Sequence, residues 1–268
     1  MNRIPSPADD SFSSQIFWRN HLALPAAGFA LLFTLVEIFG LDRPIAHALY
    51  YNAATQRWLG AGAGDWWAHQ VIHEGGRWLA RLLGVAALLA WLGSFCIDRL
   101  RKRRRTAGFI FAAVALSVGL VGVLKLVTNV DCPWDLTEFG GDRPYVGLFE
   151  HRPAMLPRGE CFPGAHASSG FALVCFYFAL RDRSRRKARW ALAAACAIGV
   201  LFSIGQEARG AHFLSHDLAS AGIVWLIQLG LYTWLLRPAI PVGEARHSPP
   251  AGGKLVGAAA AQDAGGAS

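Results

Sequence analysis

Residues 107–124 read AGFIFAAVALSVGLVGVL, an apolar run without a single charge that ends at Lys125. A helix that crosses a membrane needs about 17–25 mostly apolar residues, and this run meets that length. The whole chain has the same character, because 53% of its 268 residues are hydrophobic and only 16% are charged, against about 25% in soluble domains. The composition predicts a membrane protein and excludes an ordinary soluble domain or a disordered chain.

Five more apolar stretches lie on the two sides of this run. They cover residues 22–41, 78–97, 167–180, 190–206 and 218–236. The stretch at 167–180 is short, and it reaches spanning length if its helix begins near Pro163. An even number of crossings places both ends of the chain on one side of the membrane. The sequence therefore predicts an all-α fold, a bundle of six transmembrane helices.

The formal net charge of +8 is concentrated in two short segments. Residues 99–105 (RLRKRRR) and 181–189 (RDRSRRKAR) hold six Lys and Arg each. Neither segment has interleaved aromatic residues or a reading helix, so neither predicts a nucleic-acid partner. Basic loops between apolar spans lie in the cytoplasm. We therefore expect a multi-pass protein of the bacterial inner membrane, with segments 42–77, 125–166 and 207–217 facing the periplasm.

The domain boundaries follow from the same composition. Residues 1–20 are polar, contain two prolines and are expected to form a loose cytoplasmic tail, followed by a membrane domain over 21–237. Residues 43–76 hold three tryptophans, which predicts a short interfacial helix on the outer leaflet. Residues 238–268 are rich in Gly, Ala and Pro without apolar periodicity, which predicts a disordered tail.

Three polar motifs stand at the span ends that face the predicted periplasm. They are KLVTNVDCP at 125–133, PGAH at 163–166 and ARGAHFLSHD at 208–217. Ionisable groups at one face of a membrane bundle are functional candidates by default. The connectivity brings the three motifs to the same face, so we expect them to form one site.

In this order, the motifs resemble those of the type 2 phosphatidic acid phosphatase superfamily. That family has Lys-x6-Arg-Pro, then Pro-Ser-Gly-His, then Ser-Arg-x5-His-x3-Asp, and the resemblance covers residues 107–236. It implies a six-helix membrane fold related to that of the vanadium haloperoxidases. It also implies phosphatase chemistry through a phosphohistidine, with no metal and no cofactor.

The resemblance assigns roles to the matching residues. His166 protonates the leaving group and then activates water, and a second histidine attacks phosphorus while Asp217 orients its ring. The expected phosphate-binding residues are Lys125, Gly164, Ala165, Arg209 and Arg143. Phosphoryl transfer needs cations around the equatorial oxygens, an in-line nucleophile and an acid for the leaving oxygen, and these residue types supply all three.

Two histidines compete for the role of nucleophile. His212 lies three residues after Arg209 and five before Asp217, whereas the family spacing is six and four. Aligning His212 with the family nucleophile puts Gln206 at the family's Arg position, and aligning His216 keeps Arg209 instead. We favour His212, because Gly210 predicts a helix that begins only after it and leaves it in a turn that Asp217 can reach. The i, i+4 pair of histidines is also a possible metal pair, but no flanking Glu or Cys completes a site.

The first motif has a cysteine where the family has arginine. Cys132 occupies that position, and Arg143 in GGDRPY is the nearest residue that could restore the charge. A solvated loop arginine is the competing interpretation of Arg143. Asp135 and Glu138 would repel phosphate, so we expect them to bind Arg or Lys side chains.

Cys132 and Cys161 both fall in the predicted outer loop. An oxidising compartment permits them to form a disulfide, and the alternative is a pair of reduced thiols. The pairing would close a loop of about thirty residues, a constraint of about 3–4 kcal/mol on the chain-entropy model.

The function expected from this sequence is hydrolysis of a lipid phosphate or diphosphate at the outer leaflet. Lipid A, undecaprenyl diphosphate and phosphatidate are the substrate classes that the resemblance implies, and membrane lipids are the expected partners. A phosphotransferase would use the same phosphohistidine with a second lipid as acceptor. A membrane protein that binds anionic lipid through a degenerate site without catalysis is the competing class.

Overall fold

The computed structural model describes residues 14–237. The predicted C-terminal tail at 238–268 and residues 1–13 of the predicted N-terminal tail lie outside the described residues. Residues 14–20 were expected to be loose, but the first helical stretch already begins at Ser14. The reason is packing: Phe17 is buried, its ring centroid lies 6.0 Å from that of Tyr232, and the guanidinium of Arg181 lies 4.7 Å from its ring centroid.

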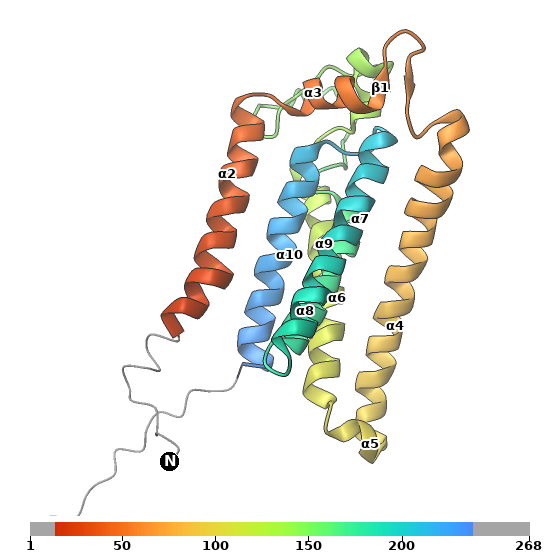
Figure 1. Cartoon of the computed structure of the whole chain (residues 1–268). Coiled ribbons are helices and arrows are strands. Elements are labelled where there is room, and N and C mark those ends of the chain that lie inside the picture. Colours follow the sequence, from red (N-terminus) through yellow and green to blue (C-terminus); the bar gives the residue numbers. More distant parts are fainter. Residues whose placement is uncertain (1–13, 238–268) are drawn as a thin grey trace, which may run out of the picture. The chain divides into compact units, whose positions relative to one another are not determined.

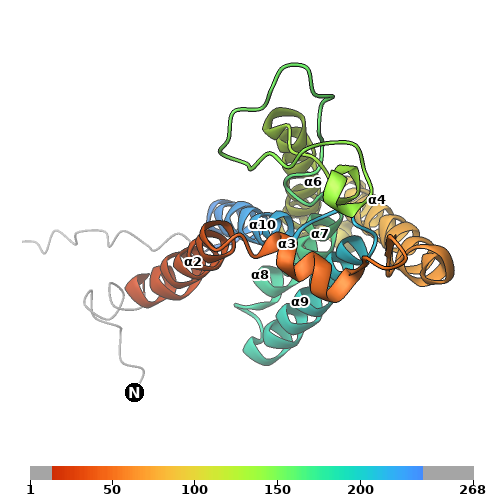
Figure 2. The same cartoon turned by 90° about the horizontal axis from the view of Figure 1, so that it is seen from above.

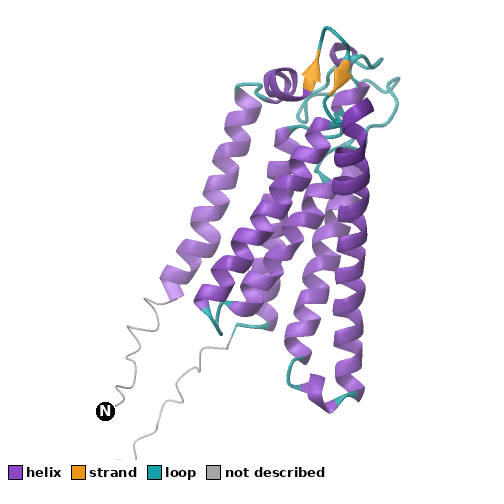
Figure 3. Ribbon diagram, turned by 45° about the vertical axis from the view of Figure 1, so that its right-hand side comes forward, coloured by secondary structure: helices purple, strands orange, loops and turns teal. Residues whose placement is uncertain are grey.

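The regular secondary structure of the described chain is helical apart from one two-stranded hairpin (Figure 1, Figure 3), so the all-α fold class is confirmed. The longer helices are α2 (Leu24–Ile38), α4 (Gly75–Cys96), α6 (Arg104–Thr128), α9 (Arg185–Ala208) and α10 (Leu214–Leu235). The central helix is built from α7 (Ala165–Phe171), η7 (Ala172–Val174) and α8 (Cys175–Leu180). The short elements are η1 (Arg19–Ala23), α3 (Asp42–Ile45), η2 (Ala46–Tyr50), β1 (Tyr51–Asn52), β2 (Arg57–Trp58), η3 (Gly62–Gly64), η4 (Trp66–Glu74), α5 (Asp98–Arg101), η5 (Pro133–Asp135) and η6 (Thr137–Phe139).

Within residues 14–237, five helical stretches are long and apolar enough to cross a membrane. They are Ser14–Ile38, Gly62–Cys96, Arg104–Asp135, Arg185–Ala208 and Leu214–Leu235. The sixth, Ala165–Leu180, is shorter and rises about 24 Å at 1.5 Å per residue, against about 30 Å of hydrocarbon. Large apolar side chains are exposed along the outer faces of α2, α4 and α6, as expected for contact with lipid.

The central helix α7–η7–α8 is enclosed by α4, α6, α9 and α10, while α2 packs against α10 at the edge (Figure 2). The helices α7 and α9 meet at two glycines. A Cβ on Gly170 would lie 2.8 Å from the Cα of Gly199, so only glycine permits this approach. Below this contact Phe178, Phe109 and Tyr232 fill the core. This packing fixes the start of α7, where the second polar motif lies.

The segment expected to be one interfacial helix over 43–76 has three parts instead. Residues of α3 and η2 lie across the end of the bundle, the β1–β2 hairpin follows, and η4 continues directly into α4 (Figure 1). The span expected at 78–97 therefore begins well before residue 78. A count of apolar residues missed this extension because η4 is polar. The extension places His73 beside His166 of the second motif.

Asp42 joins α3 to the start of α10. Its Oδ1 accepts the backbone N–H of Ser215 at 2.9 Å and its Oδ2 accepts the Ser215 hydroxyl at 2.5 Å. The side chain of Asp42 is buried and satisfies a helix N-terminus that has no side-chain cap of its own. This contact holds the first turn of α10, which carries the third motif.

We predict that Asp42→Ala lowers the free energy of unfolding by about 1–2 kcal/mol, because it removes the partner of an orphan helix N–H. Thermal unfolding of the detergent-purified protein measures the change. Asp142→Ala is the matched control, since the Asp142 side chain is 93% exposed in the same outer region. Equal melting temperatures for Asp42→Ala and Asp142→Ala would show that the contact does not stabilise α10.

Candidate active site

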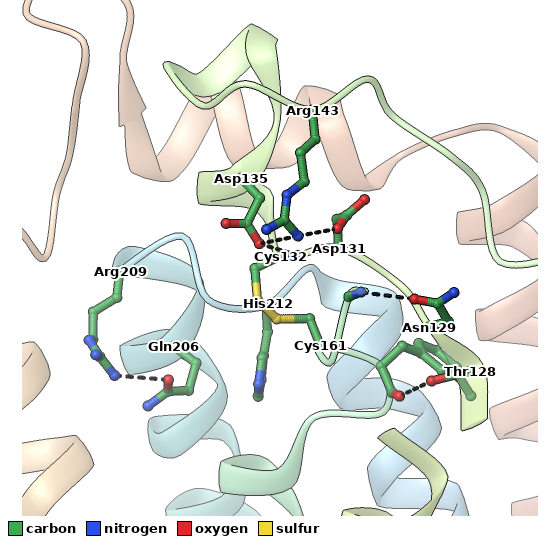
Figure 4. Close-up of a disulfide and its surroundings, with 12 residues drawn as sticks. Thr128, Asn129, Asp131, Cys132, Asp135, Arg143, Cys161, Gln206, Arg209 and His212 are labelled. Carbon is green, nitrogen blue, oxygen red and sulfur yellow. Dashed lines mark hydrogen bonds and ion pairs between the residues drawn. A yellow bond between two sulfur atoms is a disulfide. The ribbon is translucent and has the colours of Figure 1, made fainter. Parts of the chain in front are cut away.

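His212 and Asp217 form a buried pair at the outer end of the bundle. Nδ1 of His212 lies 2.8 Å from Oδ1 of Asp217. The pair depends on the turn before α10: Gly210 has a φ of +73°, and a Cβ there would meet the Trp58 ring at 2.3 Å. His212 therefore lies in the turn, ahead of Leu214–Leu235, and its side chain points into the bundle (Figure 4).

The pair leaves one nitrogen of His212 available. A carboxylate only accepts, so Nδ1–H donates to Asp217, and no described residue forms a hydrogen bond with Nε2. Burial, reinforced by the positive charges of Lys125 and Arg209, holds the pKa of His212 well below its usual range. The ring is therefore neutral at pH 7, with a free lone pair on Nε2.

His166 lies in the first turn of α7 with its ring stacked on Phe202, at 4.6 Å between ring centroids. Its Nε2 lies 3.2 Å from the carbonyl oxygen of Ile72. A carbonyl only accepts, so Nε2 carries a hydrogen, and Nδ1 is left as the nitrogen that can exchange a proton. His166 is buried. Its charged or titratable neighbours include His212 and Arg209.

Two cations flank the histidines. Lys125 lies in the last turn of α6, close enough to act on the charges of Asp217 and His212. Arg209 follows α9, and its Nη1 donates to Oε1 of Gln206 at 3.1 Å (Figure 4). Three motifs that are far apart in the sequence thus supply a neutral imidazole, a second imidazole and two cations to one site.

A family model described as the PAP2 superfamily matches residues 106–239, half of the chain. The chain belongs to the PAP2 superfamily. No curated protein and no solved structure matches the chain. Membership of the PAP2 superfamily implies a phosphatase-type activity on a phosphate ester.

The PAP2 match contains all the candidate site residues named from the sequence. The structure brings some of them together and gives others contacts that differ from the expected ones. Lys125, His166, Arg209 and the His212–Asp217 pair lie together. Gly164 was expected to offer its N–H to phosphate, but that N–H donates to the carbonyl of His216 at 3.0 Å. Ala165 begins α7, and N–H groups in the first turn of a helix have no partner within the helix.

Gly164 has a steric role. A Cβ at this position would lie 2.1 Å from Oδ1 of Asp217 and 2.8 Å from Nδ1 of His212. The PAP2 pattern has serine here, and a serine would displace the buried pair as the structure has it. The absence of a side chain at Gly164 therefore leaves room for the His212–Asp217 pair.

We predict that Gly164→Ala lowers the free energy of unfolding by about 1–3 kcal/mol, the usual cost of overpacking a close-packed site. The control is Gly119→Ala in α6, where a Cβ meets nothing within 4 Å and alanine favours the helix by about 0.5–1 kcal/mol. Thermal unfolding of both variants is the measurement. A Gly164→Ala protein as stable as Gly119→Ala would contradict the steric role.

Arg143 is held away from a phosphate-binding role by carboxylates. Its Nη1 lies 2.7 Å from Oδ1 of Asp131 and 3.6 Å from Oδ2 of Asp135, and Arg152 also pairs with Asp131 at 2.6 Å. Figure 4 draws Arg143 on one side of the disulfide and His212 on the other. The Arg143 charge is thus neutralised by Asp131 and Asp135, and nothing in this geometry makes it a substitute for the family arginine.

The cysteine at the family's Arg position forms a disulfide. Cys132 is joined to Cys161 with 5.1 Å between their Cα atoms (Figure 4). The acidic residues of the same loop pair as expected from their charge: Asp135 with Arg143, and Glu138 with Arg43 at 2.6 Å. The bridge ties the segment after α6 to the segment before α7, so it fixes the distance between two of the motifs.

His216 occupies a different position from His212. It is 2% exposed and lies between the rings of Phe162 and Phe213, and its Nδ1 has no hydrogen-bond partner among the residues that the structure describes. Its ring centroid is 6.0 Å from that of His212. In the described chain, His212 and His216 belong to no group of three possible metal ligands. This geometry favours His212 over His216 as the reactive histidine.

Sequence reasoning missed His73. Its ring centroid lies 4.7 Å from that of His166, and its Nδ1 lies 2.8 Å from Nε2 of Gln206. Because His73 falls in the segment that was expected to lie on the membrane surface, and outside residues 106–239, neither composition nor the PAP2 pattern points to it. Only the outward extension of α4 through η4 brings it to the site.

Proposed function

We propose that this chain is a lipid phosphatase that hydrolyses a lipid phosphate or diphosphate through a phosphohistidine on His212. The observation that carries the proposal is the buried His212–Asp217 pair, with Nδ1–H held by a carboxylate and Nε2 free. A nucleophilic histidine needs this arrangement, because the fixed tautomer keeps the lone pair on the attacking nitrogen.

The reaction proceeds in two displacements. The Nε2 lone pair of His212 attacks phosphorus, the bond from phosphorus to the leaving oxygen breaks, and His166 gives that oxygen a proton. Water then attacks the phosphohistidine, His166 takes a proton from it, and the P–N bond breaks to restore His212. Asp217 stabilises the positive charge that His212 carries between the two steps.

Lys125 and Arg209 stabilise the charge on the equatorial oxygens. They are the two cations beside His212, and burial makes each worth more than an exposed charge. The family's third cation is replaced by Cys132, whose sulfur is committed to the disulfide. The N–H groups at the start of α7 supply further donors to the phosphate.

A lipid substrate is supported by the surroundings of the site. The helices that carry it are apolar on their exposed faces. At the same end, a cavity of about 580 Å³ lies between α2 and the loop after η6. It is lined by apolar side chains such as Phe33, Val36 and Leu148 and by the charged Glu37, Asp42, Arg43 and Glu150. An acyl or prenyl chain fits along its apolar side chains. A second cavity of about 10 Å³ shares Leu148 and Tyr145 with it and touches Phe162 and His216, which leaves room for about one water.

We further propose six crossings of the bacterial inner membrane, with the site facing the periplasm. The central helix spans the bundle despite its length, since α7 begins inside the polar site at Ala165 and does not start at the membrane surface. The basic segments 99–105 and 181–189 lie at the opposite end of the bundle (Figure 1), where the positive-inside rule places them in the cytoplasm.

The sidedness is tested with reporter fusions after Arg103, Gly141 and Arg185. We predict cytoplasmic reporter activity at Arg103 and Arg185 and periplasmic activity at Gly141. A periplasmic signal at either arginine, or a cytoplasmic signal at Gly141, would contradict the proposed leaflet.

We predict that His212→Ala abolishes both phosphate release and the trapped phosphoenzyme, a loss of at least about 10³-fold, because no other group can form the covalent bond. His216→Ala keeps measurable turnover. The measurement is phosphate release from a panel of lipid phosphates and diphosphates by purified protein, with rapid quench of a radiolabelled substrate to trap the intermediate.

The controls separate the competing assignments. A phosphoenzyme in His212→Ala together with an inactive His216→Ala would make His216 the nucleophile. Phosphate that appears on an added acceptor lipid and not in solution would make the protein a phosphotransferase. Wild-type protein that binds the lipid panel but never releases or transfers phosphate would end the catalytic proposal.

A further inference from the structure

Three side chains of η4, the segment that continues into α4, converge on one point outside the phosphate site. They are His69, His73 and Glu74, and their possible ligand atoms all lie within 4.8 Å of one another. Nε2 of His69 is 3.9 Å and Nε2 of His73 is 3.7 Å from Oε1 of Glu74. The same Oε1 accepts from Nη1 of Arg77 at 2.7 Å, so an ion bound here displaces this arginine. Ligands of a tetrahedral ion at about 2.0–2.2 Å lie about 3.3–3.5 Å apart, so small rotations of these side chains close the geometry.

Polar groups lie behind both imidazoles. Nδ1 of His69 lies 3.7 Å from Oδ1 of Asp65, and Nδ1 of His73 lies 2.8 Å from the amide nitrogen of Gln206. The two rings are nearly parallel, at 21° and 5.6 Å between centroids. In metal sites the second nitrogen of a histidine ligand is held by an oxygen, which His73 gains when the Gln206 amide turns. Two imidazoles and one carboxylate suit zinc and leave a fourth position open.

We propose that His69, His73 and Glu74 bind a zinc ion that inhibits the enzyme, an inference that rests on the proposed function for its effect on turnover. The site is reached from outside, because all three side chains are partly exposed. The ion lies next to the catalytic histidine, since His73 is 4.7 Å from His166 between ring centroids.

Gln206 couples zinc binding at His73 to the hydrogen bond of Arg209. In the structure Arg209 donates to Oε1 of Gln206, so the amide turns its Nε2 toward Nδ1 of His73, and the His73 proton is on Nε2. Zinc needs that nitrogen, so the Nε2 proton leaves to water and Nδ1 takes one. Nδ1–H then needs an acceptor, and the Gln206 amide turns its oxygen toward it. Arg209 now faces the NH₂ group and loses its hydrogen bond.

The contact that is lost is the one that holds Arg209 beside the phosphate site. Arg209 is one of the two cations proposed to stabilise the phosphate oxygens, so zinc lowers kcat.

The test begins with binding, which does not depend on activity. Full-length protein without a polyhistidine tag is stripped with chelator, and zinc is measured by calorimetric titration and by elemental analysis after dialysis. We predict one zinc ion per chain in the wild type, and dissociation constants at least about tenfold weaker in His69→Ala and in Glu74→Gln. His151→Ala is the matched control, because His151 is an exposed histidine of the same outer face.

The second readout is turnover on the lipid that the wild type hydrolyses. Zinc lowers kcat of the wild type and of His151→Ala at least about tenfold and leaves His69→Ala, whose basal activity is unchanged, uninhibited. Failure to bind stoichiometric zinc, binding that His69→Ala and Glu74→Gln do not weaken, or binding without inhibition of an active wild type would each overturn the inference. A wild type without activity on any lipid phosphate would refute the proposed function, while the titrations still decide the metal site.

Discussion

A buried carboxylate must be paired, and the pairing of Asp217 with His212 constrains the whole outer end of this protein. The pair requires the turn between α9 and α10 to hold one conformation. Three neighbouring segments hold it: Trp134 donates its backbone N–H to Gly210 at 2.9 Å, Asp42 accepts from Ser215, and the Trp58 ring lies where a side chain at residue 210 would be. Each support comes from a different part of the chain. The site is thus the point where these segments meet, and its geometry is determined by packing more than by the motif that contains it.

The disulfide changes the balance of charge around the site. Where the PAP2 pattern has an arginine, Cys132 contributes a covalent tie and no positive charge. The nearby arginines do not replace it, because Arg143 and Arg152 both pair with the buried Asp131. The charges of Arg143 and Arg152 in this loop are therefore offset by its carboxylates. In the proposed mechanism, phosphate charge is left to Lys125, Arg209 and the start of α7, a smaller set than the family pattern has.

The sequence was sufficient for the coarse architecture because apolar length and charge asymmetry are local signals. The run at 107–124 and the two basic segments indicate a membrane bundle without any alignment, and Gly210 indicates that His212 lies in a turn. What could not be predicted depends on tertiary contact. Arg143 was a candidate for phosphate until Asp131 was seen beside it, and the Gly164 N–H was a candidate until the His216 carbonyl was seen to accept it. His73 was missed because η4 is too polar to count as part of a span, although it is continuous with α4.

The contact between Gly164 and the His212–Asp217 pair links two departures from the family pattern that are distant in the sequence. The third motif has one residue more between its reactive histidine and its aspartate than the pattern has, and the second motif has lost the serine side chain that would meet that aspartate. Each change makes sense only beside the other. Restoring serine alone places its Cβ against Oδ1 of Asp217. The two positions are epistatic, so any route between this form of the site and the common one has to change both motifs.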